Sequence, residues 1–165
     1  MTLLDKDTVK RVEKFLKKFN PKQEIITLNT SARTANDAAT SLSCETGAIV
    51  KSLLFRTENS FILCLVAGDK RASLNKIKKI LNIRDVSMAS ADDVKNITGY
   101  SIGAVSPVGH LNKIDILIDK SLKRFTSLFA AAGHPNCVFE TNFIDLQKIT
   151  SGSIEEISEW ENLNY

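Results

Sequence analysis

The sequence predicts an α+β domain in which helices flank a central, mixed and largely antiparallel sheet. Three observations support this class. Several segments repeat apolar residues every three to four positions, as amphipathic helices do. Residues 49–56 and 61–66 are apolar, extended segments joined by a short polar turn, which predicts a hairpin. No internal repeat, low-complexity tract or linker divides the chain, so one domain spanning residues 1–165 is expected.

Composition places the chain among globular proteins. It has 165 residues, of which 43% are hydrophobic and 25% charged, values that exclude disordered and collagen-like chains. No apolar run approaches the roughly 20 residues that span a bilayer, and residues 1–18 lack the apolar core of a signal peptide. We therefore expect a cytoplasmic protein without a membrane partner.

Capping residues fix where most helices begin. Thr34, Ser73, Ser90 and Asn142 each stand before an apolar-periodic segment and can accept a hydrogen bond from its first turn. The expected helices are 4–19, 35–42, 74–81, 91–98 and 143–149. The expected strands are 25–28, 49–56, 61–66, 86–88, 114–118 and 138–141, and residues 127–132 fit either helix or strand.

Cysteine and histidine usage excludes several kinds of site. Cys44, Cys64 and Cys137 form no CxxC pair, and two histidines cannot complete a metal site with them. Cys64 lies inside an apolar strand and is expected in the core. Cys44 and Cys137 have no neighbouring base in the sequence that would activate a thiol. No metal and no cofactor are therefore expected.

Lys51 is the first candidate functional residue. In a strand, residues two apart share a face, so Lys51 is set between Ile49 and Leu53. A lysine among apolar neighbours is costly unless a carboxylate or an anionic ligand pairs with it. The alternative is an edge position from which the side chain reaches water, or a strand whose other face, bearing Arg56, is the buried one.

A glycine-containing loop at residues 99–109 is the second candidate. Glycines allow successive backbone amides to point at one spot, where they can hold a carbonyl oxygen or an oxyanion. The alternative is an ordinary surface turn, and the loop matches neither a P-loop nor a dinucleotide fingerprint. His134 either faces a pocket or belongs to a turn, and His110 is the weaker of the two histidines as a site candidate.

Taken in order, these features resemble the YbaK/prolyl-tRNA synthetase-associated domain family over about residues 34–157. The segments that carry the resemblance are TANDAA (34–39), IVKSLLF (49–55), LVAGDKR (65–71), MAS (88–90), GYSIGAVSPVG (99–109), ID (118–119) and AAG (131–133). Members of this family are freestanding or inserted editing domains that hydrolyse the ester of mischarged aminoacyl-tRNA. The resemblance also implies a barrel-like form of the central sheet.

The resemblance assigns roles to particular residues. Lys51 matches the family's essential strand lysine and is the expected catalytic residue. The GxxxP loop, which shapes the amino-acid pocket, corresponds to Gly103, Ala104, Val105, Ser106 and Pro107. His134 falls near a pocket-lining position. Ser52 stands where some members with alanine specificity have asparagine, which leaves the subfamily open.

The expected function is a freestanding trans-editing deacylase acting on mischarged tRNA, with proline tRNA carrying alanine or cysteine as first candidate. A synthetase is a second candidate partner. The alternative is a non-catalytic module that binds aminoacyl-tRNA or a synthetase. The net charge is only +3, but residues 6–22 and 70–84 are rich in lysine and arginine. These segments are candidate tRNA contacts or simply solvated faces. The oligomeric state stays open.

Overall fold

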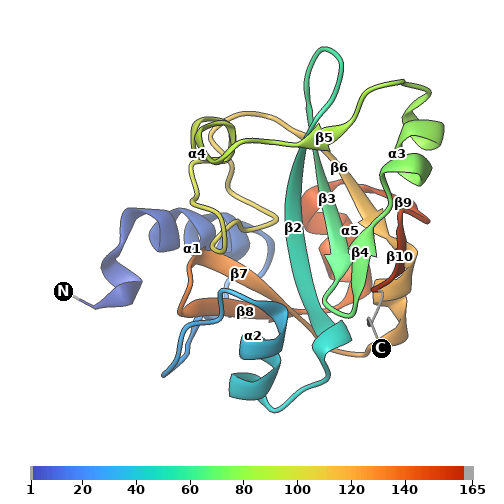
Figure 1. The fold of residues 1–165 in the computed structure, drawn as a ribbon. Coiled ribbons are helices and arrows are strands. Elements are labelled where there is room, and N and C mark those ends of the chain that lie inside the picture. Colours follow the sequence, from blue (N-terminus) through green and yellow to red (C-terminus); the bar gives the residue numbers. More distant parts are fainter. Residues whose placement is uncertain (1, 162–165) are drawn as a thin grey trace.

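A mixed sheet forms the centre of the molecule in the computed structural model, which describes residues 2–161 (Figure 1). Its strands are β1 (Ile26–Thr27), β2 (Ile49–Arg56), β3 (Phe61–Ala67), β5 (Ser87–Met88), β6 (Asp115–Asp119), β7 (Leu128–His134), β8 (Cys137–Thr141) and β9 (Ser153–Glu155). The order is β1-β8-β7-β2-β3-β6-β9, and β5 pairs with β2. A separate two-stranded sheet joins β4 (Lys70–Ala72) to β10 (Ser158–Trp160).

The central sheet contains both strand directions. The β2–β3 hairpin is antiparallel, with Val50 opposite Ala67 and Arg56 opposite Phe61. β2 runs parallel to β7, β3 parallel to β6, and β6 parallel to β9, whereas the other pairs are antiparallel. The predicted mixed, largely antiparallel sheet of a single α+β domain is therefore confirmed.

Within residues 2–161, five α-helices surround the sheet, and four of them begin at the predicted caps. They are α1 (Asp7–Phe19), α2 (Ala35–Leu42), α3 (Leu74–Leu81), α4 (Ala91–Thr98) and α5 (Phe143–Thr150). The side chains of Thr34, Ser73, Ser90 and Asn142 each accept a hydrogen bond from the amide three residues later. The first helix begins at Asp7 rather than at residue 4, because Lys6 is extended after a 3₁₀ turn at Leu3–Asp5.

Three short strands escaped the sequence analysis, and one undecided segment is resolved. β4, β9 and β10 are each three residues long, too short for alternation to reveal them. Of residues 127–132, which fit helix or strand, 128–132 lie in β7.

The core lies on both faces of β3. Leu63 and Leu65 pack into a cluster with α1 and with Tyr100 and Val105 of the 99–109 loop. Cys64, fully buried as predicted, faces the opposite cluster with Ile77 of α3. Since both faces are covered, the hairpin is a rigid support for residues on β2. No helix within residues 2–161 is long and apolar enough to cross a membrane.

Candidate functional site

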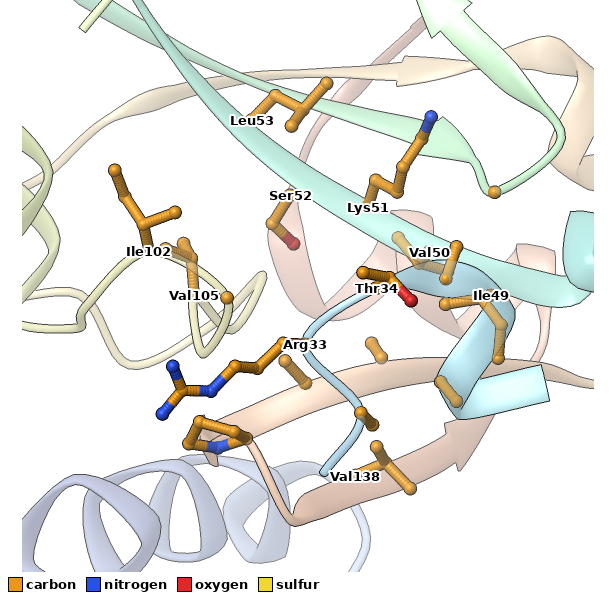
Figure 2. A pocket seen from close by; sticks show the side chains of 18 of the residues that line it. Arg33, Thr34, Ile49, Val50, Lys51, Ser52, Leu53, Ile102, Val105 and Val138 are labelled. Carbon is orange, nitrogen blue, oxygen red and sulfur yellow. The ribbon is translucent and has the colours of Figure 1, made fainter. Parts of the chain in front are cut away.

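A cavity of about 430 Å³ opens between β2, the start of α2, the β7–β8 turn and the 99–109 loop (Figure 2). Residues 49–54 of β2 form one wall, and residues 102, 103 and 105 of the loop form another. Most lining side chains are apolar, and the polar ones are few, as is usual in sites for small organic groups. Among the predicted site residues, the cavity brings together Lys51, Gly103, Val105 and His134.

The Lys51 side chain lies at the rim of this cavity and leaves β2 on the face away from the loop (Figure 2). Its ammonium donates to the backbone carbonyl of Lys70 and lies 3.3 Å from Glu161 Oε1. The side chain is 22% exposed, so the amine is neither in open solvent nor deeply buried. The apolar neighbours of Lys51 predict an anionic partner, but the sequence does not identify Glu161, which lies 110 residues away in the chain.

Ser52 points the other way, toward the 99–109 loop (Figure 2). It shares a face with Val50 and Leu54, which belong to the main core cluster. Its Oγ is buried and has no hydrogen-bond partner among residues 2–161. A buried hydroxyl without a partner costs free energy, so a rotation of the Ser52 side chain that brings Oγ to a polar group in the cavity would be favourable.

Only part of the predicted loop segment reaches the cavity. Gly103 lies on the wall with φ +88°, a conformation that favours glycine, and Val105 lies beside it. Ala104, Ser106 and Pro107 are buried behind them and do not line the cavity. The amide of Ala104 donates to Ser101 O within a turn. These three residues therefore support the loop from behind.

The loop is held from below by side chains of α1 and of the loop itself. Arg11 Nε donates to Gly109 O at 2.6 Å, and its guanidinium lies 4.6 Å from the centre of the Tyr100 ring. The Tyr100 hydroxyl donates to Val108 O at 2.7 Å, and His110 Nε2 lies 2.7 Å from Ser106 O. This bracing fixes the backbone that carries Gly103, so the segment is not an ordinary mobile surface turn.

Burial lowers the pKa of His110 below its usual value. The hydrogen bond with Ser106 raises that pKa to a smaller extent, and the charge of Arg11 lowers it further. His110 is therefore neutral at physiological pH and its Nε2–H donates to the Ser106 carbonyl. The His110 side chain therefore supports the loop backbone, and it does not line the cavity.

His134 meets both descriptions left open by the sequence. It ends β7, and its Nδ1 accepts a hydrogen bond from the Asn136 amide at 3.0 Å, which closes the turn into β8. It also lines the cavity. Partial burial, and then the charges of Lys6 and Arg33, lower its pKa. The Nδ1 hydrogen bond places the proton of the neutral ring on Nε2.

Two lining residues were not singled out by the sequence. Arg33 is exposed at the cavity mouth, and its side chain runs along the loop beside Gly103 (Figure 2). Glu161 carries the carboxylate beside Lys51. Neither belongs to a local pattern, because each reaches the site only through the fold.

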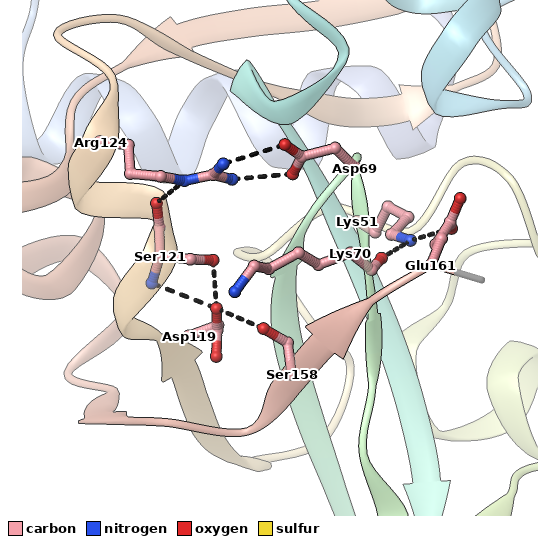
Figure 3. Close-up of polar contacts among 8 residues, drawn as sticks. All are labelled: Lys51, Asp69, Lys70, Asp119, Ser121, Arg124, Ser158 and Glu161. Carbon is pink, nitrogen blue, oxygen red and sulfur yellow. Dashed lines mark hydrogen bonds and ion pairs between the residues drawn. The ribbon is translucent and has the colours of Figure 1, made fainter. Parts of the chain in front are cut away.

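A buried carboxylate anchors the chain that carries Glu161 (Figure 3). Asp119 is 1% exposed and accepts hydrogen bonds from the amides of Ser121 and Ile157 and from the hydroxyls of Ser121 and Ser158. These bonds hold the start of β10 against the end of β6. Glu161 therefore approaches Lys51 from an anchored strand.

The two basic segments differ in how free their charges are. On α1, Lys10, Lys14 and Lys18 are exposed and form no ion pair within residues 2–161. In the 70–84 segment, Arg71 pairs with Glu159 at 2.9 Å and Lys76 with Glu156 at 3.6 Å. The acidic C-terminal region thus partly neutralises the second basic segment.

Comparison with known proteins identifies the family. The family described as the aminoacyl-tRNA editing domain matches residues 29–149. This chain belongs to that family. The match contains β2, the 99–109 loop and the cavity wall from β7 and β8, so every lining residue except Glu161 lies within the part that defines an editing domain.

Relatives of this editing domain occur both alone and within larger enzymes. The Bacillus subtilis protein YwhH, itself uncharacterized, is 29% identical over 157 residues, which cover 93% of this chain and 99% of YwhH. A proline–tRNA ligase of Caldicellulosiruptor bescii is 29% identical over 142 residues, which cover 81% of this chain and 24% of the ligase. The chain therefore spans about a quarter of the length of the ligases it matches.

A solved structure described as a candidate trans-editing enzyme for prolyl-tRNA synthetase has the same fold. It superposes with a TM-score of 0.88 at 30% sequence identity and covers 93% of this chain and 98% of the other. The α+β architecture is thus that of a YbaK-like editing domain related to those of prolyl-tRNA synthetases.

Proposed function

We propose that this protein is a freestanding trans-editing aminoacyl-tRNA deacylase that hydrolyses the ester of mischarged tRNA, with proline tRNA carrying alanine or cysteine as its first candidate substrate. Membership of the editing family supports the reaction class. The match to nearly the whole of YwhH and of a candidate trans-editing enzyme supports a domain that works alone. The match to proline–tRNA ligases supports proline tRNA.

The cavity offers a place for the aminoacyl group. Its walls are mainly apolar, and the buried Ser52 hydroxyl supplies one polar group that has no partner among the described residues. A small amino acid enters between β2 and the loop, and the Ser52 side chain rotates so that its Oγ accepts a hydrogen bond from the amino group of that amino acid. The apolar walls favour small uncharged side chains such as those of alanine and cysteine.

The rim offers cations for the nucleotide that carries the ester. Lys51 lies on one side of the mouth and Arg33 on another. In this proposal Lys51 exchanges the Glu161 carboxylate for a phosphate at the 3′ end of the tRNA, because both anions satisfy the same ammonium.

The chemistry is ester hydrolysis. Water attacks the ester carbonyl carbon, the carbonyl oxygen gains negative charge, and the bond to the ribose oxygen breaks as that oxygen takes up a proton. The products are a tRNA with a free 3′-terminal hydroxyl and a free amino acid. Amides of Gly103 and Val105 are candidate donors to the developing oxyanion, whereas the Ala104 amide is already used by Ser101 O. A hydroxyl of the substrate ribose orients the attacking water.

The observation that carries this proposal is that Lys51 and the Gly103 loop border one cavity. The test is the deacylation rate on a matrix of mischarged tRNAs, beginning with alanine, cysteine and serine on proline tRNA. Lys51→Ala should reduce the rate on the preferred substrate about 100-fold or more, with Lys51→Arg retaining part of it. An unchanged rate in Lys51→Ala removes Lys51 from the mechanism, and tight binding of aminoacyl-tRNA without any hydrolysis supports the non-catalytic binding module instead.

A further inference from the structure

A tryptophan stands exposed at the end of β10, one residue before Glu161 of the cavity lining. Trp160 is the only tryptophan of the chain, and 61% of its surface is accessible. The β4–β10 pairing places it directly opposite Lys70. This exposure leaves part of the indole ring open to a ligand.

Two cations accompany the ring. Lys70 Nζ lies 4.3 Å and Arg124 Cζ 5.2 Å from its centre. Arg124 is fixed by a two-pronged pair with Asp69, at 2.9 and 2.7 Å, and by a bond to Ser121 O (Figure 3). No carboxylate within the described part of the chain pairs with the Lys70 ammonium, so this lysine is free to move to an arriving anion.

The two strands that carry Lys70 and Trp160, β4 and β10, also lead to the contacts of Lys51 at the cavity rim. The backbone carbonyl of Lys70 accepts the hydrogen bond from Lys51, and Glu161, the residue after Trp160, lies beside the same ammonium (Figure 3). Lys70 and Trp160 therefore belong to the same short stretch of backbone as the two groups that contact the Lys51 ammonium, and the ring lies one residue along the chain from the cavity lining.

We propose that Trp160, Lys70 and Arg124 form a nucleotide-binding platform that receives the single-stranded 3′ end of the RNA just before the ester-bearing nucleotide. A base stacks on the indole ring of this Trp160 platform, and Lys70 and Arg124 contact the adjoining phosphates. Single-stranded RNA is bound in this way in general, by aromatic faces for bases combined with cations for the backbone. The inference rests on the proposed function for the direction in which the strand runs.

The test uses Trp160 as its own reporter, because the chain has no other tryptophan. Titration with a five-nucleotide RNA ending in CCA should quench the tryptophan fluorescence, whereas a blunt-ended RNA duplex of equal charge should quench it much less. Anisotropy of a labelled copy of the same five-nucleotide RNA gives Kd for the variants. Trp160→Ala should raise Kd about 5- to 150-fold, and Trp160→Phe, which keeps an aromatic face, should stay close to the wild type.

Ile144→Ala is the matched control, since Ile144 is similarly exposed at 66% but lies on α5 and does not line the cavity. Thermal melts confirm that each variant is folded. An unchanged Kd in Trp160→Ala, or equal quenching by the duplex, overturns the platform.

Failure of the platform and failure of the deacylase are distinguishable. If Trp160→Ala binds RNA like the wild type while the wild type still deacylates mischarged tRNA, the platform is wrong and the proposed function stands. If the wild type deacylates nothing but its fluorescence is quenched and Trp160→Ala binds weakly, the platform stands as a single-strand RNA site and the deacylase is wrong.

Discussion

Lys51 and Ser52 are neighbours on β2, yet their polar atoms serve opposite sides of the strand: the ammonium contacts Lys70 O and Glu161, and the hydroxyl faces the 99–109 loop. The alternation of a strand makes this separation unavoidable. A substrate that engages both residues must therefore pass around the edge of β2, with its anionic part at the rim and its acyl part in the cavity.

Removing the Ser52 hydroxyl should stabilise the empty protein. Ser52→Ala removes a buried oxygen that has no partner in the described part of the chain, and we expect the free energy of unfolding to rise by about 1 kcal/mol. Ser106→Ala is the matched control, because its buried Oγ accepts a bond from the Val108 amide and its loss should cost about 1–3 kcal/mol. Urea unfolding of both variants measures the difference in the free energy of unfolding. A destabilised Ser52→Ala would contradict the inference that Ser52 Oγ is buried without a hydrogen-bond partner.

Neutralising Glu161 should strengthen RNA binding. Glu161→Gln removes the carboxylate that competes with phosphate for Lys51, and since the pair is partly exposed the gain in affinity should be about 1.4- to 5-fold. Glu159→Gln, two residues away and paired with Arg71, provides the comparison. Kd for uncharged tRNA at two salt concentrations tests this. An equal effect of the two variants would show that the change in net charge, and not the release of Lys51, raises the affinity.

Much of the fold, and part of the site, follows from local sequence. The caps at Thr34, Ser73, Ser90 and Asn142 work within one helical turn, so they are visible without any knowledge of the fold. The face of β2 that carries Lys51 also follows from alternation.

What the sequence could not reveal depends on distant partners. β10 exists because it pairs with β4, more than 80 residues earlier, and three residues carry no periodicity of their own. For the same reason Glu161 was not identified as the neighbour of Lys51. The engagement of the Ala104 amide with Ser101 O also depends on the particular turn adopted, which the glycines permit but do not specify.

The Asp119 carboxylate should be a major determinant of stability. Asp119→Asn keeps the size of the side chain but replaces one acceptor oxygen with a donor, where four donors converge. We expect a loss of about 2–4 kcal/mol in the free energy of unfolding. Asp115→Asn, exposed on the same strand, should change it by less than about 0.5 kcal/mol. Urea titration of the two variants compares them directly, and equal losses would show that the network contributes little.

His110 should make stability depend on pH. Its pKa in the folded state is lowered, so the unfolded chain binds a proton more readily, and stability present above about pH 6.5 is lost as pH falls toward the folded pKa. His110→Gln keeps a donor for Ser106 O but cannot titrate, and its unfolding free energy should fall less between pH 7.5 and 5. If the free energy of unfolding depends on pH in the same way for the wild type and His110→Gln, His110 makes no such contribution. His134→Gln measures the contribution of the second histidine, whose pKa is lowered as well.

Arg11 and Ser158 lie outside the 29–149 segment that matches the editing family, yet one supports the loop through Gly109 O and the other completes the shell of Asp119. The segment shared with the family is therefore shorter than the segment needed to hold the site in its observed geometry. A fragment trimmed to the shared segment would keep every residue that lines the cavity except Glu161, but it would lose Arg11 and Ser158, which hold the loop and the Asp119 network in place.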